Sequence, residues 1–305
     1  MSKFIQKIKT LCKTKYILQK KIVNSPFIKL FPDRWALKII YKSIFEKKLN
    51  LKNPKTFNEK LQWLKLYNRR PEYTTMVDKY AVKKYVLDIL GEEYIIPTLG
   101  VWEKFDDIDF DALPDRFVLK TTHGSGDIVI CKDKANFDKI KAKEKLTKAL
   151  KTNYYKIARE WPYKNVPRRI IAESYMEDVS GALKDYKFFC FDGEAKFMFV
   201  ATDRSIDCRF DFFDMGFNHL DVINLHPLAE KPIEKPDHFE EMKHIAEVLS
   251  KGLAHVRIDL YEINGKIYFG EYTFFHASGF SVFKPKEFDY LFGSYLNLPE
   301  RYKGD

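Results

Sequence analysis

The chain has 305 residues, of which 45% are hydrophobic and 31% charged, and its formal net charge is +10 at pH 7. This balance is typical of a folded globular protein and excludes a largely disordered chain, and the length is sufficient for two or three subdomains. The positive charge favours anionic partners. Because the 26 Phe and 18 Tyr lie in apolar runs rather than among Arg- and Gly-rich stretches, we expect no nucleic-acid partner.

The first 23 residues, MSKFIQKIKTLCKTKYILQKKIV, carry a lysine every few positions and lack the apolar centre of a secretory signal. The cysteines are far apart and form no Cys-x-x-Cys pair, which is typical of reduced thiols in the cytoplasm. They are Cys12, Cys131, Cys190 and Cys208. We therefore expect a cytoplasmic protein. The basic segment is either a peripheral helix on the inner face of an anionic membrane or a helix packed on its own protein.

Residues 1–75 are predicted to be mainly helical. The segments WALKIIYKSIFEKKLN (35–50) and FNEKLQWLKLYNR (57–69) both repeat apolar residues at intervals of three and four. Thr56 ends the turn LKNPKT just before the second segment, where a hydroxyl can cap a helix.

From residue 94 onward the pattern changes to short β-branched and aromatic runs separated by Gly, Asp or Pro, which predict strands. These runs are residues 94–102, 116–122, 126–132, 168–176, 184–193, 194–203 and 208–214. Helical segments are expected at 136–160 and 238–253, and the strands within 256–275 are joined by Asn264-Gly265, a strong hairpin signal. The order lacks the regular alternation of a doubly wound sheet and predicts the α+β class.

The stretch FVLKTTHGSGDIVI (117–130) places Lys120 at a strand end before a loop that contains Gly124 and Gly126. Glycines let backbone N–H groups approach an anion, and the ammonium supplies the counter-charge, so the pattern is suited to phosphate. A hairpin without a ligand would use the same glycines, and both interpretations stay open on this stretch alone.

The last predicted hairpin carries Arg257 and Asp259 on one strand and Glu271 and Thr273 on the other. Alternate residues of a strand share a face, so the four side chains gather if the two faces coincide. Carboxylate and hydroxyl oxygens would then suit Mg²⁺ that bridges nucleotide phosphates. The alternative is a solvated surface with an Arg–Glu pair across the strands.

Two further charged residues stand in apolar strands. Glu173 ends the run RRIIAE, where a carboxylate can accept from ribose hydroxyls, although many strands simply end in such a residue. Lys187 lies among the aromatic residues of KDYKFFCFDG, which indicates either a bound anion or carboxylate or an edge strand.

These features, in this order, resemble the ATP-grasp superfamily, and more closely its TupA-like branch, found among genes for capsular and cell-wall polysaccharides. The resemblance covers roughly residues 50–290 and rests on the phrases NPKTFNEKLQWLKLY, DKYAVKKYV, LPDRFVLKTTHGSG, DYKFFCFDG and GEYTFFHASGF. It implies an ATP-grasp fold, in which two α+β subdomains clasp ATP, here with a largely helical N-terminal region. The implied divisions are 1–75 (helical), 76–180 (phosphate flap and adenine hinge) and 181–305 (metal-binding hairpin).

The resemblance also implies roles for individual residues. ATP would be held by Lys83, Lys120, Thr121, Gly124, Ser125, Gly126, Glu173, Tyr175, Met176 and Lys187. Mg²⁺, as two ions, would be held by Asp259, Glu271 and Thr273, the last standing where the family usually has Asn. The implied catalytic residues are Arg257 for stabilising the anionic intermediates, His123 as a proton shuttle and Ser278, which borders the acceptor with His276 and Gly279.

The implied reaction joins a carboxylate to an amine through an acyl-phosphate. We expect the acceptor to be an anionic, uronic-acid-containing surface polysaccharide or its precursor, and the amine to be small, such as an amino acid. The alternatives are a phosphotransferase on the same fold, a binding protein with a degraded site, and a glycosyltransferase, for which Asp107 and Asp109 in DDIDFD (106–111) offer a metal motif.

Overall fold

The computed structural model describes residues 25–179, 184–202 and 208–303. The basic segment at residues 1–23, with its predicted membrane contact, lies outside the described residues. Within the described part of the chain, no helix combines the length and the apolar character needed to cross a bilayer.

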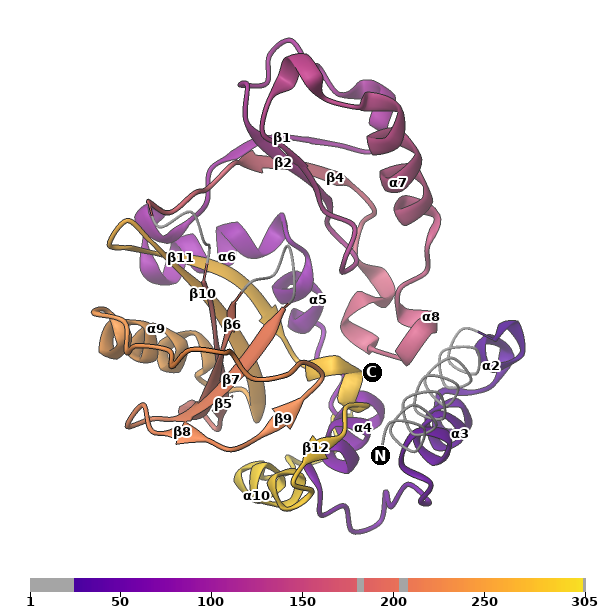
Figure 1. The fold of residues 1–305 in the computed structure, drawn as a ribbon. Helices are drawn as coiled ribbons and strands as arrows, with labels where there is room; N and C mark the ends of the chain where they lie inside the picture. Colours follow the sequence, from indigo (N-terminus) through magenta and orange to yellow (C-terminus); the bar gives the residue numbers. More distant parts are fainter. Residues whose placement is uncertain (1–24, 180–183, 203–207, 304–305) are drawn as a thin grey trace, which may run out of the picture.

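Two antiparallel sheets form the frame of the molecule, one above the other in Figure 1. The first sheet has the strand order β1-β4-β2-β3 and the second β11-β10-β5-β6-β7-β8. The strands of the first sheet are β1 (Thr98–Trp102), β2 (Phe117–Thr121), β3 (Val129–Cys131) and β4 (Ile170–Ser174). Those of the second are β5 (Asp185–Phe191), β6 (Glu194–Thr202), β7 (Arg209–Asp214), β8 (His219–Leu220), β10 (His255–Ile263) and β11 (Lys266–Thr273). Separate antiparallel sheets with helices confirm the predicted α+β class.

Of the predicted helical region 1–75, the described residues from 25 onward are largely helical, and they pack mainly on the second sheet. The helices before the first strand are α2 (Pro26–Leu30), α3 (Asp33–Phe45), α4 (Phe57–Tyr67), α5 (Glu72–Val77) and α6 (Ala81–Leu90). The predicted cap at Thr56 is confirmed, because its side chain accepts from the backbone N–H of Glu59 and the Glu59 carboxylate accepts from the N–H of Thr56.

The first sheet has a small core of its own. Phe117 and Leu119 of β2 are fully buried against Ala142 and Leu146 of α7 (Lys139–Lys151). The short helix α8 (Tyr155–Ala158) and the 3-10 turn η4 (Trp161–Asn165) then lead back toward the second sheet. The remaining 3-10 turns before this point are η1 (Glu92–Tyr94), η2 (Phe105–Asp107) and η3 (Lys134–Asn136).

Every residue of β5 is buried, and the strand's alternation explains where a polar site can form. Phe188 and Cys190 face helix α9 (Phe239–Ser250), against Phe239 and the Ala246 carbonyl. On the opposite face, Phe189 lies under Phe57 of α4. The first residues of β5 on that same face are charged instead of apolar, so the face is divided into an apolar end and a polar end.

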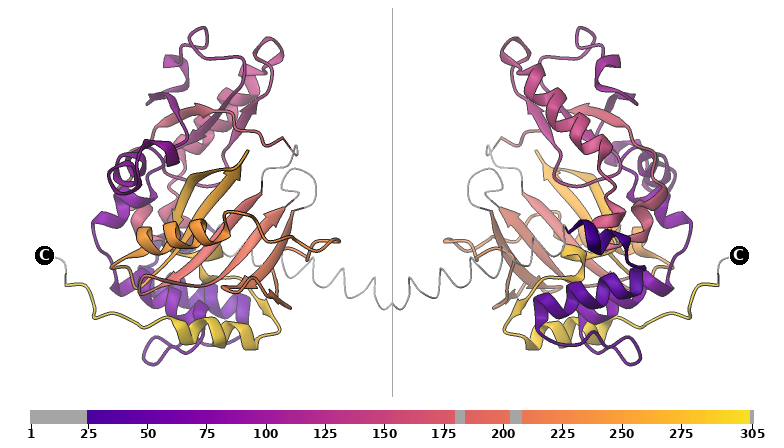
Figure 2. Two further views of the ribbon diagram at one scale, coloured as in Figure 1. Left: turned by 90° about the vertical axis from the view of Figure 1, so that its left-hand side faces the viewer. Right: turned by 90° about the vertical axis from the view of Figure 1, so that its right-hand side faces the viewer.

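The C-terminal elements cover the apolar end of this face of the second sheet. They are β9 (Ile223–Asn224), η5 (His276–Gly279), β12 (Phe283–Lys284) and α10 (Glu287–Tyr295). Phe292 of α10 stacks on Phe197 of β6, with ring centroids 3.6 Å apart. Figure 2 shows α10 and α4 at the lower end of the molecule and the first sheet at the upper end, so the polar part of the second sheet lies toward the first sheet.

Candidate functional site

Arg257 and Asp259 of β10 and Lys187 of β5 form a buried ion network at the polar end of the second sheet. The register places Lys187 directly opposite Asp259. Arg257 donates to both carboxylate oxygens, Nε to Oδ1 at 2.6 Å and Nη2 to Oδ2 at 2.7 Å, and Lys187 pairs with Oδ2 and with Asp185. Burial raises the pKa of Asp259, but Arg257 and Lys187 outweigh this and lower it to about 2. The carboxylate is therefore ionised near neutral pH.

A β-bulge brings Glu271 to the same face as Asp259. The hairpin begins with Ile263 opposite Lys266, and continuing that register would set Asp259 opposite Gly270 and turn Glu271 to the other face. The register shifts between Asp259 and Leu260, so Glu271 pairs with Asp259 and Thr273 with Arg257. A Cβ on Gly270 would lie 2.9 Å from the Asp259 carbonyl oxygen, so the bulge needs glycine there. The predicted coincidence of the two faces is thus found, with the bulge as its cause.

Glu271 is the most accessible carboxylate of this group. Its side chain is 37% exposed, and its ion contact with Arg257 Nη2 is long, at 3.6 Å. The Thr273 hydroxyl accepts from the same Arg257 nitrogen at 3.0 Å. Among the described residues, no three His, Cys, Asp or Glu side chains are grouped to hold a metal ion. Mg²⁺ is often held by only one or two carboxylates together with substrate phosphates, and the oxygens of Glu271 and Asp259 fit that mode.

On the first sheet, Glu173 of β4 is held between two lysines. Lys120 of β2 lies 2.5 Å from Oε2, and Lys83 of α6 lies 2.7 Å from Oε1. Burial raises the pKa of Glu173, but the two lysines outweigh it and lower the pKa below its ordinary value. Lys83, Lys120 and Glu173, which the resemblance assigned separately to ATP, therefore form one cluster with a net positive charge.

Lys79 lies within the electrostatic influence of both clusters, and no motif in the sequence predicted it as a site residue beside Lys83. Its backbone N–H donates to the Thr122 carbonyl at 3.2 Å, and its ammonium donates to the Gly124 carbonyl of the predicted flap. Burial lowers the pKa of Lys79, while Glu271, Asp127 and Glu173 act in the opposite direction, so both sheets contribute charges around it. The one feature of the sequence that could have indicated Lys79 is its place in the pair Asp78-Lys79 just before α6.

The flap residues lie in the connection between β2 and β3. The Thr121 hydroxyl donates to Asp127, and Ser125 is exposed. Gly126 has φ of +86°, in the left-handed region that favours glycine.

His123 faces away from these groups. Its side chain is 3% exposed, and its surroundings include the backbone of Ala149 and Thr152 at the end of α7. Burial lowers its pKa, so the ring is neutral near pH 7. This position does not bring His123 beside Arg257 or Glu271, and it favours a role in holding the flap.

The turn η5 follows the β10–β11 hairpin and ties it to the N-terminal region. Burial and the charge of Arg257 hold the pKa of His276 well below its usual value. The neutral ring accepts from Arg257 through Nδ1 at 2.8 Å and contacts Asn224 Oδ1 through Nε2 at 2.8 Å. His276 thus positions Arg257. Gly279 has φ of +62°, and its carbonyl accepts from Gln62 at 2.7 Å.

Ser278 in the same turn contacts residues that no motif predicted. Its hydroxyl donates to Glu160 Oε1 at 2.5 Å, and its carbonyl accepts from Lys65 at 2.7 Å. Glu160 and Lys65 lie 118 and 213 positions from Ser278 in the chain, so no local spacing could have associated them.

Two predicted residues lie at the periphery of the described site. Tyr175 follows β4 and stacks under Arg116, whose guanidinium carbon is 4.3 Å from the ring centroid. Met176 is half-buried beside it. The structure thus brings the lysines predicted to bind phosphate and the predicted carboxylate and guanidinium groups onto facing sheets. Tyr175 and Met176, from the predicted adenine hinge, lie at one end.

Comparisons with known proteins agree with this arrangement. The family described as TupA-like ATPgrasp matches residues 59–297. No curated protein matches the chain.

Solved structures show more distant likeness. D-alanine–D-alanine ligase from Bacillus anthracis is 20% identical, with a TM-score of 0.39 over 65% of this chain and 56% of that one. The L-amino acid ligase from Bacillus licheniformis is 13% identical, with a TM-score of 0.42 over 81% and 55%. The ATP-grasp ligase PsnB, complexed with minimal precursor, Mg and ADP, is 13% identical, with a TM-score of 0.38 over 79% and 62%.

The chain thus spans little more than half the length of the solved relatives that it matches. Since no TM-score of these three reaches 0.5, the assignment rests on the sequence match, which covers more than half of the chain. On that match, the chain belongs to the TupA-like ATP-grasp family.

Proposed function

We propose that the protein is an ATP-dependent carboxylate–amine ligase that forms an amide through an acyl-phosphate and releases ADP and phosphate. The observation that carries this proposal is the pairing of two polar clusters on facing sheets. Lys120, Lys83 and Glu173 lie on the first sheet, and Arg257, Asp259 and Glu271 lie on the second, with Lys79 electrostatically coupled to both. Cations on one side and carboxylates on the other suit a phosphate chain with its metal ions.

Within this proposal, Lys79, Lys120 and Lys187 neutralise phosphate charge, and Glu173 with Tyr175 and Met176 borders the nucleoside. The flap residues 121–126 cover the phosphates. Glu271 and Asp259, with the Thr273 hydroxyl, would hold two Mg²⁺ ions, which would supply neutralisation of the charge of the transferred phosphoryl group. Arg257, fixed by Asp259 and by the neutral His276, stabilises the anionic acyl centre.

The proposed acceptor is a uronic-acid-containing surface polysaccharide or its precursor, and the proposed nucleophile is an amino acid or small amine. The net charge of +10 supports an anionic acceptor. The glycosyltransferase alternative has weaker support, because Asp109 Oδ1 accepts from the backbone N–H groups of Asp111 and Ala112 and so serves a turn.

The test uses Mg-ATP with UDP-glucuronate or oligogalacturonate as the carboxylate, and hydroxylamine or each amino acid as the nucleophile. A ligase forms ADP, together with a hydroxamate or an amide detected by mass. Phosphate transfer that does not depend on the nucleophile would instead support the phosphotransferase. Stabilisation against heating by UDP-sugars but not by ATP would support the glycosyltransferase.

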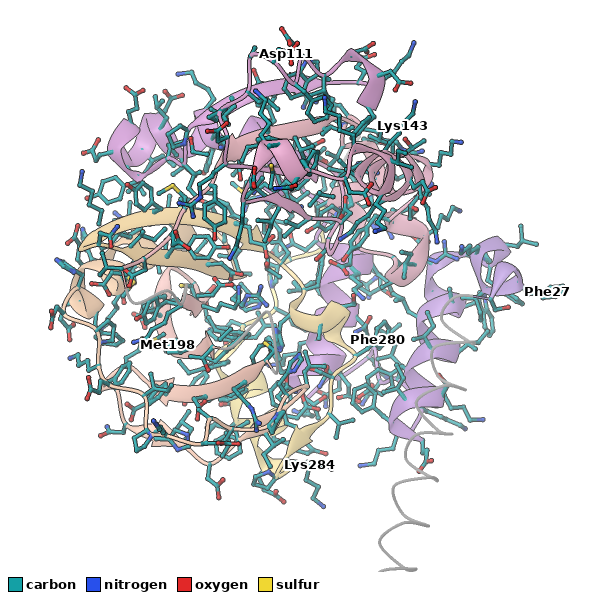
Figure 3. All side chains as sticks on the ribbon, turned by 45° about the horizontal axis from the view of Figure 1, so that its top comes forward. Phe27, Asp111, Lys143, Met198, Phe280 and Lys284 are labelled. Atoms are coloured by element: carbon teal, nitrogen blue, oxygen red, sulfur yellow. The ribbon has the colours of Figure 1, made fainter. Side chains whose placement is uncertain are left out.

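We also propose that the protein works in the cytoplasm, in peripheral contact with the anionic inner face of the membrane. Besides the basic first 23 residues, the described helices α2 and α3 expose large apolar side chains, and Figure 3 shows Phe27 at the outer edge of the molecule. These side chains are Phe27, Leu30, Phe31, Trp35 and Ile39, and the basic residues among them are Lys29, Arg34, Lys38 and Lys42. Apolar and basic side chains side by side suit an anionic lipid surface.

Sedimentation with vesicles of phosphatidylglycerol and phosphatidylcholine tests this contact. Trp35→Glu should reduce the bound fraction, whereas Ile140→Glu, at a position on α7 that is 75% exposed, should not. Equal binding of both variants and of the unaltered chain would contradict a role for α2 and α3.

A further inference from the structure

Glu160 is a buried carboxylate without a direct cationic partner in the described structure. It lies between α8 and η4 and is 5% exposed. Its Oε1 accepts from the Ser278 hydroxyl at 2.5 Å. Among residues 25–179, 184–202 and 208–303, no Lys, Arg or His nitrogen forms an ion pair with it. Buried carboxylates are rarely left in this state, because desolvation of the charge is costly unless a cation or several donors compensate.

The buried cation whose charge acts most strongly on Glu160 is Lys65, and it is already satisfied by neutral acceptors. Its ammonium donates to the Gln62 side chain at 3.0 Å and to the carbonyls of Ala158 at 2.9 Å and Ser278 at 2.7 Å. Since an ammonium has three donors, none remains for Glu160. Lys65 therefore stabilises the fold of the η5 turn and lowers the electrostatic cost of Glu160 only from a distance.

Glu160 faces the site that the proposed ligase reaction uses. Ser278 belongs to the turn that starts with His276, the residue that positions Arg257. Burial raises the pKa of Glu160, and the charges of Glu271 and Arg257 are close enough to act on it in opposite directions. The Glu160 carboxylate thus lies near Arg257 and Glu271 but takes no part in the ion network of Arg257, Asp259 and Lys187.

Two aromatic rings accompany Glu160. Tyr154 and Tyr163 are half-buried and stand edge to face, with ring centroids 4.8 Å apart. Both are near enough to Glu160 and Glu271 for those charges to raise their pKa, after burial as the main cause. A carboxylate beside aromatic rings is a recurrent environment for ammonium groups, since both attract a cation. An anionic ligand, in contrast, would be repelled.

We propose that Glu160, with Ser278, Tyr154 and Tyr163, forms the subsite that binds the ammonium group of the amine substrate. This inference rests on the proposed ligase function and names the place where its second substrate is held. The cation supplies the counter-charge that Glu160 lacks, and the short link through Ser278 to the turn after the hairpin holds the amine beside the acyl centre. When the nitrogen is deprotonated and attacks, the carbon–oxygen bond to phosphate breaks, and the two protons that the nitrogen loses leave with the released phosphate.

The test is Glu160→Gln, which keeps the shape and removes the charge. Glu103→Gln makes the same change at an exposed position after β1 and serves as the control. Steady-state rates are measured with an amino acid, which presents an ammonium group, and with hydroxylamine, which is largely uncharged at neutral pH and does not need the subsite. We expect kcat/KM for the amino acid to fall about 10- to 100-fold, as for loss of a charged hydrogen bond, mainly through KM. Hydroxamate formation should change by no more than about threefold, a change of under 1 kcal/mol in the barrier.

A variant that retains full amino-acid activity, or that loses both activities with an unchanged melting temperature, would overturn the proposal. If the unaltered chain gives no hydroxamate and no amide, the ligase function itself has failed. The subsite is then judged by thermal stabilisation with ethylammonium chloride relative to sodium chloride at equal ionic strength. Stabilisation that Glu160→Gln abolishes and Glu103→Gln keeps supports the subsite, and equal responses refute it. Ser278→Ala, which leaves the charge in place, provides a second variant and should weaken ammonium binding less than Glu160→Gln.

Discussion

Asp259 and Glu271 are paired across the same hairpin, but the structure predicts opposite stability effects for their neutral variants. Asp259 is 1% exposed and binds two buried cations, Arg257 and Lys187. Glu271 is 37% exposed and has one long ion contact. The variant Asp259→Asn therefore removes the counter-charge that two buried cations share, leaving Lys187 with Asp185 and Arg257 with only the long Glu271 contact, whereas Glu271→Gln keeps Asp259 in place.

The expected loss of stability of each variant follows from the ion contacts that the substitution removes. Removing one partner of a buried ion pair costs about 3–5 kcal/mol, and loss of a partly exposed contact costs about 1 kcal/mol or less. For a chain of 305 residues, each kcal/mol lowers the melting temperature by roughly 1.5 °C. We therefore expect a decrease of roughly 5–8 °C for Asp259→Asn and of at most about 2 °C for Glu271→Gln.

Differential scanning calorimetry gives the melting temperatures, and ADP release with Mg-ATP and an acceptor gives the activity. Both variants should lose ADP formation if the two carboxylates hold Mg²⁺, but only Asp259→Asn should lose stability. Near-normal Mg-dependent turnover of Glu271→Gln would refute the metal assignment. An unchanged melting temperature of Asp259→Asn would refute the inference that its ion pairs stabilise the fold.

Three further outcomes follow from the structure. Gly270→Ala should lower the melting temperature and the activity together, because the new Cβ would lie 2.9 Å from the Asp259 carbonyl oxygen and displace the bulge; activity equal to that of the unaltered chain would show that the bulge tolerates a side chain. Lys120→Ala should weaken ATP binding about tenfold or more in calorimetry, since it removes a cation from the Glu173 cluster, and unchanged affinity would remove Lys120 from the site. Folded-state pKa values of Asp259 and Glu173 lie below the ordinary values, so the stabilising effect of both carboxylates is present above about pH 4 and decreases as the pH falls; for Asp259, whose pKa is about 2, it is lost as the pH approaches that value. Urea unfolding at a series of acidic pH values should show this decrease, and a flat profile would contradict it.

The sequence predicted the hairpin with its polar residues, but the physical cause of their meeting was not visible in it. Asn264 and Gly265 both have positive φ, as the predicted tight turn requires. Counting outward from that turn would separate Glu271 from Asp259 by one position. Only the bulge at Gly270 restores the pairing of Asp259 with Glu271. A glycine in a strand can mark a bulge, a bend or a close backbone approach, so Gly270 alone does not predict a bulge.

Site residues in the loops between helices and strands were harder to predict than site residues on strands. Glu173 and Lys120 lie on neighbouring strands at recognisable positions, and their association was expected. Glu160 and Lys79 stand in short connections whose path depends on the packing of α8, η4 and α6. No periodicity marks such residues, because a turn follows the elements that it joins and not its own sequence pattern.

The contacts made by Lys79 and its neighbour Asp78 have a consequence for how the molecule can move. Asp78, which ends α5 on the second-sheet side, pairs with Arg169 just before β4 at 2.6 Å, and the next residue holds both the Thr122 and the Gly124 carbonyls. The β2–β3 connection, which we propose covers the phosphates, is thus joined to the segment that follows α5. We therefore expect opening of this connection and separation of the two sheets to be coupled, so that product release requires both movements.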